Sequence, residues 1–172
     1  MLYTLYTTTQ SPLGELLLAG AADSDGPAVL TSVSFTSSVS FAGAGAVTGG
    51  RQAPGAFESA IQQLAAYFAG DLRDFDLARA DGGSPFQRRV WNAVDAIAYG
   101  STVTYGEIAA RIGAPRDRIR AVAAAIGANP LLIVRPCHRV IGASGSLTGY
   151  AGGVERKLGL LTLEGALQPV LP

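Results

Sequence analysis

The first part of the chain carries the alternation of apolar and polar positions that is typical of β-strands. Residues 2–8 are rich in β-forming side chains, and residues 12–19 follow the Ser11-Pro12 turn signal as a hairpin partner. Alternation over residues 29–35 places Leu30, Ser32 and Ser34 on one face and Val29, Thr31, Val33 and Phe35 on the other. The pattern predicts a small β-sheet.

Helical spacing replaces this alternation between Phe57 and Phe68, and Gly70 follows as a stop signal. The stretch 41–55, rich in Gly and Ala at its start, is predicted as a loop or connector. We therefore expect residues 1–83 to form a small N-terminal domain with a sheet and one helix. This domain shows no recognisable chemistry of its own.

Helix signals dominate the second part. Ser84–Gln87 supplies an N-cap serine, a proline at the first helical position and a glutamine at the capping-box position. Thr104–Glu107 is a second capping box, which opens a short helix ending at Gly113, and another helix follows over residues 115–126. Two short helices joined by a tight turn predict a helix-turn-helix, a pattern that other helical hairpins share. The fold class predicted is α+β, with a mainly helical domain over residues 84–172.

Composition and charge fit a folded protein with an uneven charge distribution. The 172 residues are 48% hydrophobic, which suits one ordinary domain or two small ones. Residues 1–83 hold three arginines against eight acids, whereas residues 84–172 hold ten basic residues against five acids. This asymmetry fits a polyanion partner for the second half, or equally two oppositely charged faces that attract each other.

No targeting or membrane segment is evident in the sequence. The first ten residues have no basic region followed by an apolar core, and no apolar run approaches membrane-spanning length. We therefore expect a cytoplasmic protein that does not bind membranes.

The helix over residues 115–126 combines arginines with small residues. Arg116, Arg118 and Arg120 lie in its first turns, and Ala121 and further alanines follow. Arginines near a helix start fit phosphate contacts, and alanines allow a close backbone approach to a groove. The alternative is a tight helix–helix contact with solvated arginines.

The only cysteine and the only histidine of the chain are neighbours, Cys137 and His138. A single cysteine excludes an internal disulfide, and one Cys with one His makes the usual zinc sites improbable, so no metal is expected. An adjacent imidazole can help a thiol to become the reactive thiolate. Residues 131–134 read as a short strand, in which Cys137 and His138 would point to opposite faces, so cooperation needs a bend that Pro136 can provide. The alternative is a buried, inert cysteine.

The residues around Cys137 form an extended recognisable motif. Residues 129–140 contain Pro-Cys-His-Arg-Val and are followed by Gly145, Leu147, Gly149-Tyr150, Gly152-Gly153, Lys157, Leu160-Leu161 and Glu164-Gly165. This pattern strongly resembles the O6-alkylguanine-DNA alkyltransferases over residues 84–166, and Ser11–Gly14 matches the N-terminal region of that family more weakly.

The resemblance implies DNA repair by a single irreversible transfer. Cys137 would accept the alkyl group of O6-alkylguanine, His138 would act as its base through a water molecule, and Glu164 would orient the histidine. Asn129 would tie the turn that carries the cysteine loop. No cofactor is expected, and since the thioether product is stable, each molecule would react once.

The resemblance also implies how double-stranded DNA is bound. The protein, expected as a monomer, would approach the minor groove and flip the damaged base out of the stack. Arg120 would replace that base, and Tyr105 would press on the neighbouring phosphate and contact the base edge. Further expected DNA contacts are Arg116, Arg118, Ala121 and Arg139. The expected base pocket consists of Tyr150, Val140, Ile126, Leu147, Gly149, Ala151, Gly152 and Lys157, with Lys157 near the charge that develops on the leaving base.

Arg135 and the pair Ile126-Gly127 depart from the family pattern. Arg135 stands where an aliphatic residue usually precedes Pro-Cys, so its guanidinium has to reach solvent, DNA or an acid. Ile126 and Gly127 replace a larger or more polar pair, which bears on the alkyl groups accepted. Two other functions stay open from the residues alone: a DNA-binding module without chemistry, and a Cys-His-Glu thiol hydrolase that turns over repeatedly.

Overall fold

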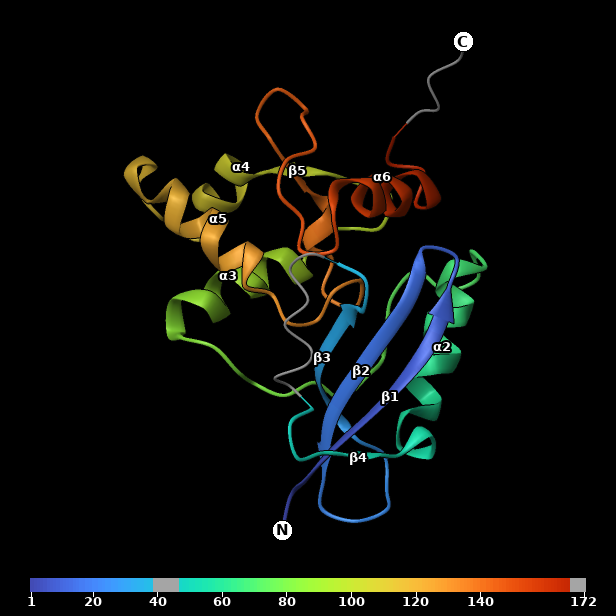
Figure 1. The fold of residues 1–172 in the computed structure, drawn as a ribbon. Coiled ribbons are helices and arrows are strands. Elements are labelled where there is room, and N and C mark those ends of the chain that lie inside the picture. Colours follow the sequence, from blue (N-terminus) through green and yellow to red (C-terminus); the bar gives the residue numbers. More distant parts are fainter. Residues whose placement is uncertain (39–46, 168–172) are drawn as a thin grey trace. The chain divides into compact units, whose positions relative to one another are not determined.

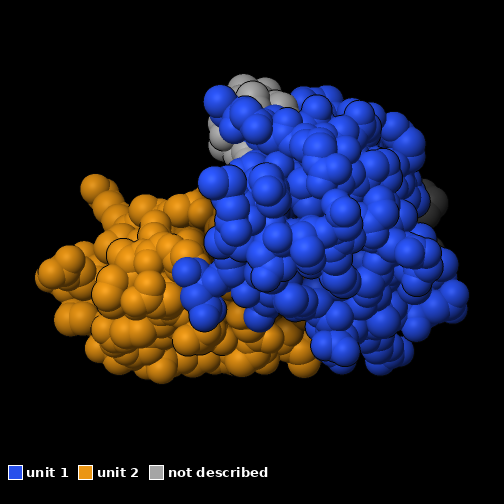
Figure 2. Space-filling model, turned by 90° about the horizontal axis from the view of Figure 1, so that it is seen from below, with its two compact units in different colours: residues 1–81 blue, residues 82–172 orange. Residues whose placement is uncertain are grey.

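The protein has an α+β fold, as predicted. The computed structural model describes residues 1–38 and 47–167 (Figure 1). The chain divides into two compact units, residues 1–81 and 82–172, which are coloured separately in Figure 2.

Unit 1 is built on a four-stranded sheet in the order β3-β2-β1-β4. The strands are β1 (Tyr3–Ser11), β2 (Gly14–Ala22), β3 (Val29–Phe35) and β4 (Arg51–Gln52). β1 and β2 form the predicted antiparallel hairpin, with Ser11 opposite Gly14, while β4 runs parallel to β1. The predicted loop over 41–55 therefore needs correction: residues 41–46 lie outside the described part of the chain, and residues 51 and 52 belong to the sheet.

A β-bulge breaks the alternation predicted for β3. Ala19 pairs with Ser32 and Gly20 with Leu30, so Thr31 has no partner in β2. The extra residue shifts the alternation, and Leu30, Val33 and Phe35 are all buried, although the sequence pattern placed Leu30 on the other face. The backbones approach closely here, since a Cβ at Gly20 would lie 2.6 Å from the Val29 carbonyl oxygen.

The helix predicted in the first unit is confirmed as α2 (Glu58–Phe68), preceded by the 3₁₀-helix η1 (Pro54–Phe57). Gly70 follows with a φ of 82°, a conformation that favours glycine at a helix C-terminus. The buried face of the helix consists of Ala60, Leu64 and Tyr67. It packs against the core that Leu5, Leu16, Leu18, Leu30, Val33, Phe35 and Phe57 form.

Unit 2 is mainly helical. Its elements are α3 (Pro85–Asp95), β5 (Val103–Thr104), α4 (Tyr105–Arg111), η2 (Arg116–Arg118), α5 (Ile119–Gly127), η3 (Cys137–Arg139), β6 (Val140–Ile141) and α6 (Val154–Leu163). Both predicted capping boxes are present: Ser84 with Gln87 at α3, and Thr104 with Glu107 at α4. β5 and β6 pair in parallel and bring Val140 beside Val103.

The helix-turn-helix is formed by α4 and α5, and both helices pack against α3. Gly113, with a φ of 71°, makes the turn between them. The second helix begins as the 3₁₀-helix η2 and not as an α-helix, and Gly127 is its last residue, with Ala128 as the cap. Trp91 on α3 donates its indole N–H to the Ala125 carbonyl at 2.8 Å, which fixes α5 against α3.

The short strand predicted over residues 131–134 is wrong, because this segment forms tight turns. Val134 N–H donates to the Leu132 carbonyl at 2.8 Å, and Arg135 N–H donates to the Leu131 carbonyl at 2.9 Å. Ile133 lies at the centre of the first turn with a φ of 71°, which β-branched residues rarely adopt. Its side chain is buried, so packing holds a strained backbone at the entrance to the cysteine loop.

Candidate active site

Cys137 and His138 lie in one turn of a 3₁₀-helix. Pro136 precedes this turn as its N-cap, where the sequence required a bend. Successive side chains of a 3₁₀-helix point about 120° apart, so the two need not face opposite ways as in a strand. Both are buried: Cys137 is 6% exposed and His138 is 0% exposed.

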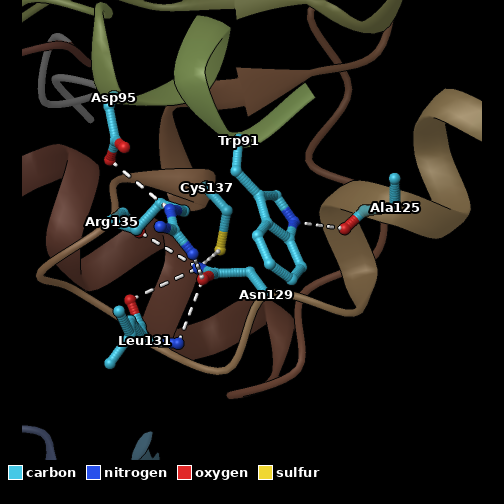
Figure 3. A network of polar contacts seen from close by, with 7 residues as sticks. All are labelled: Trp91, Asp95, Ala125, Asn129, Leu131, Arg135 and Cys137. Carbon is cyan, nitrogen blue, oxygen red and sulfur yellow. Dashed lines mark hydrogen bonds and ion pairs between the residues drawn. The ribbon is translucent and has the colours of Figure 1, made fainter. Parts of the chain in front are cut away.

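Asn129, to which the resemblance gives the role of tying the turn, contacts the cysteine loop through its side-chain amide. Its Oδ1 accepts from the Leu131 N–H at 3.0 Å. Its Nδ2 donates to Cys137 Sγ at 3.1 Å, to the Arg135 carbonyl at 3.2 Å and to the Leu131 carbonyl at 3.3 Å. Figure 3 shows this amide between the turn of residues 131–135 and the sulfur. One side chain therefore both shapes the loop and contacts the thiol.

Glu164 is the acid that meets His138. Its carboxylate lies 2.8 Å from His138 Nε2 and also accepts from Arg139 Nε at 2.7 Å and Nη2 at 3.0 Å. Arg139 donates a further hydrogen bond to the Ile97 carbonyl at 2.7 Å and is only 5% exposed. The expectation that Arg139 contacts DNA is therefore wrong: its guanidinium is buried and orients Glu164.

Burial keeps both reactive groups neutral in the resting protein. It raises the pKa of the Cys137 thiol, against which the hydrogen bond from Asn129 and the charges of Lys157 and Arg135 act. Burial also lowers the pKa of His138 despite the Glu164 carboxylate. A neutral imidazole that donates from Nε2 to Glu164 has Nδ1 left as an acceptor, and Nδ1 is buried without a hydrogen bond to any described residue.

The lowered pKa of His138 predicts a fold that is sensitive to mild acid. Below about pH 6.5 the histidine of an unfolded chain binds a proton, whereas His138 in the folded protein stays neutral. The free energy of unfolding therefore decreases as the pH is lowered, by up to about 1.4 kcal/mol per pH unit. Urea unfolding between pH 7.5 and 5.5 measures this slope. Most carboxylates titrate near pH 4, and His138 is the only histidine. A free energy of unfolding that is constant over this range would contradict the prediction.

Two predicted site residues meet at the loop over residues 147–152. The Tyr105 hydroxyl donates to the Thr148 carbonyl at 3.1 Å. Lys157 Nζ donates to the same carbonyl at 3.0 Å and to the Gly149 carbonyl at 3.3 Å. Burial raises the pKa of Tyr105 and lowers that of Lys157. Tyr150 lies edge-on to His138, with ring centroids 6.5 Å apart. These contacts join α4 and α6 to the segment beside the reactive pair.

The remaining predicted residues fall into two groups. Arg116, Arg118 and Arg120 are exposed on η2 and α5, and Ala121 beside them is half-buried. Of the expected pocket residues, Ile126, Val140 and Gly152 are buried, Leu147 and Ala151 are half-buried, and Gly149 is exposed.

The guanidinium of Arg135, which was expected to reach solvent, DNA or an acid, lies beside the carboxylate of Asp95. The sequence analysis did not identify Asp95 as a site residue. Arg135 is 8% exposed, and its Nε lies 3.5 Å from Asp95 Oδ1. The guanidinium carbon also lies 4.7 Å from the centroid of the Trp91 ring, and Figure 3 shows these groups around Asn129. Trp91 and Asp95 are four residues apart on α3 and so share a face, but this spacing alone does not point to Arg135.

Within residues 1–38 and 47–167, no three His, Cys, Asp or Glu side chains gather to hold a metal ion. In the same described ranges, every helix is too short or too polar to cross a membrane.

Two family models match the chain. The model described as 6-O-methylguanine DNA methyltransferase, DNA binding domain, covers residues 85–166. The model described as 6-O-methylguanine DNA methyltransferase, ribonuclease-like domain, covers residues 1–79.

Individual relatives match over nearly the whole chain. A methylated-DNA–protein-cysteine methyltransferase of Mycolicibacterium paratuberculosis is 51% identical over 92% of this chain and 91% of its own length. The protein of the same name from Mycobacterium tuberculosis is 48% identical over 95% of this chain and 94% of its own. A crystal structure of Mycobacterium tuberculosis OGT in complex with DNA superposes with a TM-score of 0.82 and 48% identity, covering 94% of this chain and 93% of that one. The chain belongs to the 6-O-methylguanine DNA methyltransferase family.

Proposed function

We propose that this protein repairs DNA by moving the alkyl group of O6-alkylguanine onto Cys137, once per molecule. The observation that carries the proposal is the sole cysteine of a member of this family, hydrogen-bonded by Asn129 and adjacent to the His138–Glu164 pair. No cofactor is needed, because the nucleophile, its base and the group that orients the base belong to the chain.

The transfer is a displacement at the alkyl carbon. The thiol proton of Cys137 passes through a water molecule to Nδ1 of His138, whose Nε2 stays on Glu164. The sulfur then forms a bond to the alkyl carbon while the O6–carbon bond breaks. The electron pair of the broken bond remains on O6 of the base. The base takes up one proton, which balances the proton that left the thiol, and remains in the DNA as guanine. Lys157 and Tyr105 supply a positive charge and a hydrogen-bond donor beside that base.

DNA binding is assigned to the helix-turn-helix of residues 84–172. The exposed Arg116 and Arg118 contact phosphates, Arg120 fills the stack when the base is flipped out, and Ala121 allows close approach in the minor groove. The half-buried Leu147 and Ala151 and the neighbouring Tyr150 receive the flipped base together with Ile126, Val140, Gly149 and Gly152. The protein acts as a monomer in the cytoplasm, and residues 1–83 form a separate domain.

The decisive experiment is the intact mass of the protein after mixing with excess duplex DNA that contains one O6-methylguanine. We expect a gain of one methyl group, mapped to Cys137, and no further gain with time. Cys137→Ser should gain nothing, because a serine hydroxyl is not ionised near neutral pH. Tight binding without a mass change would favour a DNA-binding module. Continued turnover of an acyl substrate would favour a thiol hydrolase.

Arg120→Ala separates base flipping from chemistry. We expect transfer from methylated duplex DNA to slow by about 10–100-fold, because unstacking a base costs a few kcal/mol that the arginine offsets. Transfer from free O6-benzylguanine, which needs no flipping, should change less than twofold. Arg111→Ala, which removes an exposed arginine from α4, is the matched control. Equal losses on both substrates would remove Arg120 from this role.

A further inference from the structure

We propose that Arg135 is a positioning residue for the transfer, because it holds the Asn129 amide with its NH₂ group toward the sulfur of Cys137. The proposal deepens the function proposed above and rests on it. It concerns a residue outside the reactive group, at a position where the family pattern has an aliphatic side chain.

The orientation of the Asn129 amide decides what the sulfur meets. In the structure, Nδ2 lies 3.1 Å from Cys137 Sγ, and Oδ1 lies 3.4 Å from Arg135 Nη1. An amide turned over by 180° would place its oxygen against the sulfur and its NH₂ against the guanidinium. Oxygen repels a thiolate, and two donors cannot bond each other. Together with the Leu131 N–H, which donates to the same oxygen at 3.0 Å, Arg135 therefore disfavours the orientation that would oppose ionisation of the thiol.

Arg135 can hold the amide because its own guanidinium is held from other sides. Asp95 Oδ1 lies 3.5 Å from its Nε, and the Trp91 ring centroid lies 4.7 Å from its central carbon. Trp91 is itself fixed by its hydrogen bond to the Ala125 carbonyl. A planar guanidinium can stack on a ring while its N–H groups reach polar partners, which an aliphatic or ammonium side chain cannot do. Figure 3 shows Arg135 and Cys137 pointing toward the same amide.

The guanidinium also contributes charge. Arginine stays protonated at every pH of interest, so a buried positive charge is always present near the sulfur. It acts in the direction that lowers the pKa of Cys137, together with Lys157 and the Asn129 hydrogen bond, against the raising effect of burial. Asp95 partly balances this charge. Reaction requires the thiolate, so both the oriented amide and the charge favour the reactive form over the resting form.

Two pH profiles test the proposal. The first follows carboxamidomethylation of Cys137 by iodoacetamide, which titrates the only thiol of the chain without any need for alkyl transfer. The second follows benzyl transfer from free O6-benzylguanine. Wild type is compared with Arg135→Met, Arg135→Gln and Arg135→Lys, and with Arg111→Met, which removes an exposed arginine of α4. Thermal unfolding of each variant shows whether it is folded.

We expect the midpoint of both profiles to move to higher pH in Arg135→Met and Arg135→Gln. Arg135→Lys should restore the midpoint in part, and Arg111→Met should not shift it. A higher pKa lowers the thiolate fraction at pH 7 but makes the remaining thiolate more nucleophilic. For every tenfold loss of thiolate, the greater nucleophilicity restores about threefold of the transfer rate, so transfer should slow by about threefold. Loss of the amide orientation adds to this decrease.

A folded Arg135→Met variant with the same midpoint as Arg111→Met would overturn the proposal and leave Arg135 as packing alone. Should the methionine variant fail to fold, Arg135→Leu decides in the same way, because it also lacks both the N–H donor and the charge. Arg135→Gln keeps an N–H donor for Asn129 without the charge, so its midpoint separates the two contributions. Normal iodoacetamide profiles together with absent benzyl transfer in wild type would refute the proposed function and not the role of Arg135.

Discussion

Glu164→Gln is expected to destabilise the protein by about 3–5 kcal/mol, a large share of the 5–15 kcal/mol typical of a folded domain. The carboxylate is buried and accepts from Arg139 twice and from His138 once. A glutamine has one oxygen for these three donors, so one N–H faces its NH₂ group and the Arg139 charge loses its counter-charge. Urea unfolding at pH 7.5 measures the loss.

The same change should also slow alkyl transfer by about 10²–10⁴-fold, the usual contribution of a general base. His138 loses the acceptor that fixes its hydrogen on Nε2, so Nδ1 is no longer held as the proton acceptor. Glu155→Gln is the matched control, because Glu155 is exposed in the first turn of the same helix, and we expect less than about 1 kcal/mol there. Equal free energies of unfolding for the two variants would show that the Glu164 contacts do not stabilise the fold by the expected amount.

Asn129→Ala is expected to give the second-largest effect. The Leu131 N–H would lose its acceptor in a buried position, which costs about 1–3 kcal/mol, and the carbonyls of Leu131 and Arg135 would lose a donor. The thiolate of Cys137 would lose a hydrogen bond of the charged kind, worth about 1.5–3 kcal/mol. We therefore expect transfer at pH 7 to slow by at least about tenfold.

Asn129→Asp tests the donor to the sulfur while it keeps the oxygen that accepts from Leu131. It places a carboxylate oxygen where the NH₂ group meets the sulfur and the carbonyls of Leu131 and Arg135. The variant should be no more stable and no more reactive than Asn129→Ala, since the oxygen faces two carbonyls and a second negative charge opposes the thiolate. Asn92→Ala, an exposed change on α3, controls for the loss of an amide side chain. A fully reactive Asn129→Asp would show that the hydrogen bond to the sulfur is dispensable.

Local signals in the sequence were sufficient for α2, α3 and α4, whereas α6 was not predicted and the helix predicted over residues 115–126 begins as the 3₁₀-helix η2. Each capping box involves residues three apart, so Ser84 with Gln87 and Thr104 with Glu107 could be read without knowledge of the rest of the fold. The bulge at Thr31 and the turn at Ile133 could not. Both depend on what the segment packs against, and Ile133 in particular contradicts its own backbone preference.

The residues of the active site were also predicted only in part. The resemblance pointed to Cys137, His138, Glu164 and Asn129, and the structure places His138 against Glu164 and Asn129 against Cys137. The expected DNA contact of Arg139 was wrong, because a positive charge in the sequence fits a DNA phosphate and a buried carboxylate equally well, and in the structure Arg139 pairs with Glu164. The partner of Arg135 lies 40 positions earlier in the chain, so only the folded structure could identify it.

Burial of Cys137 also determines how long an unused molecule stays usable. A protein that reacts once has to keep its sulfur intact through all the time before it meets a lesion. Oxidants attack exposed thiolates, and beyond the sulfenic acid the damage is essentially permanent. With 6% of the residue exposed and the pKa of the thiol raised, little thiolate is offered to peroxide or to stray electrophiles. The burial that lowers the reactivity of Cys137 therefore also keeps each newly made molecule able to react until it meets a lesion.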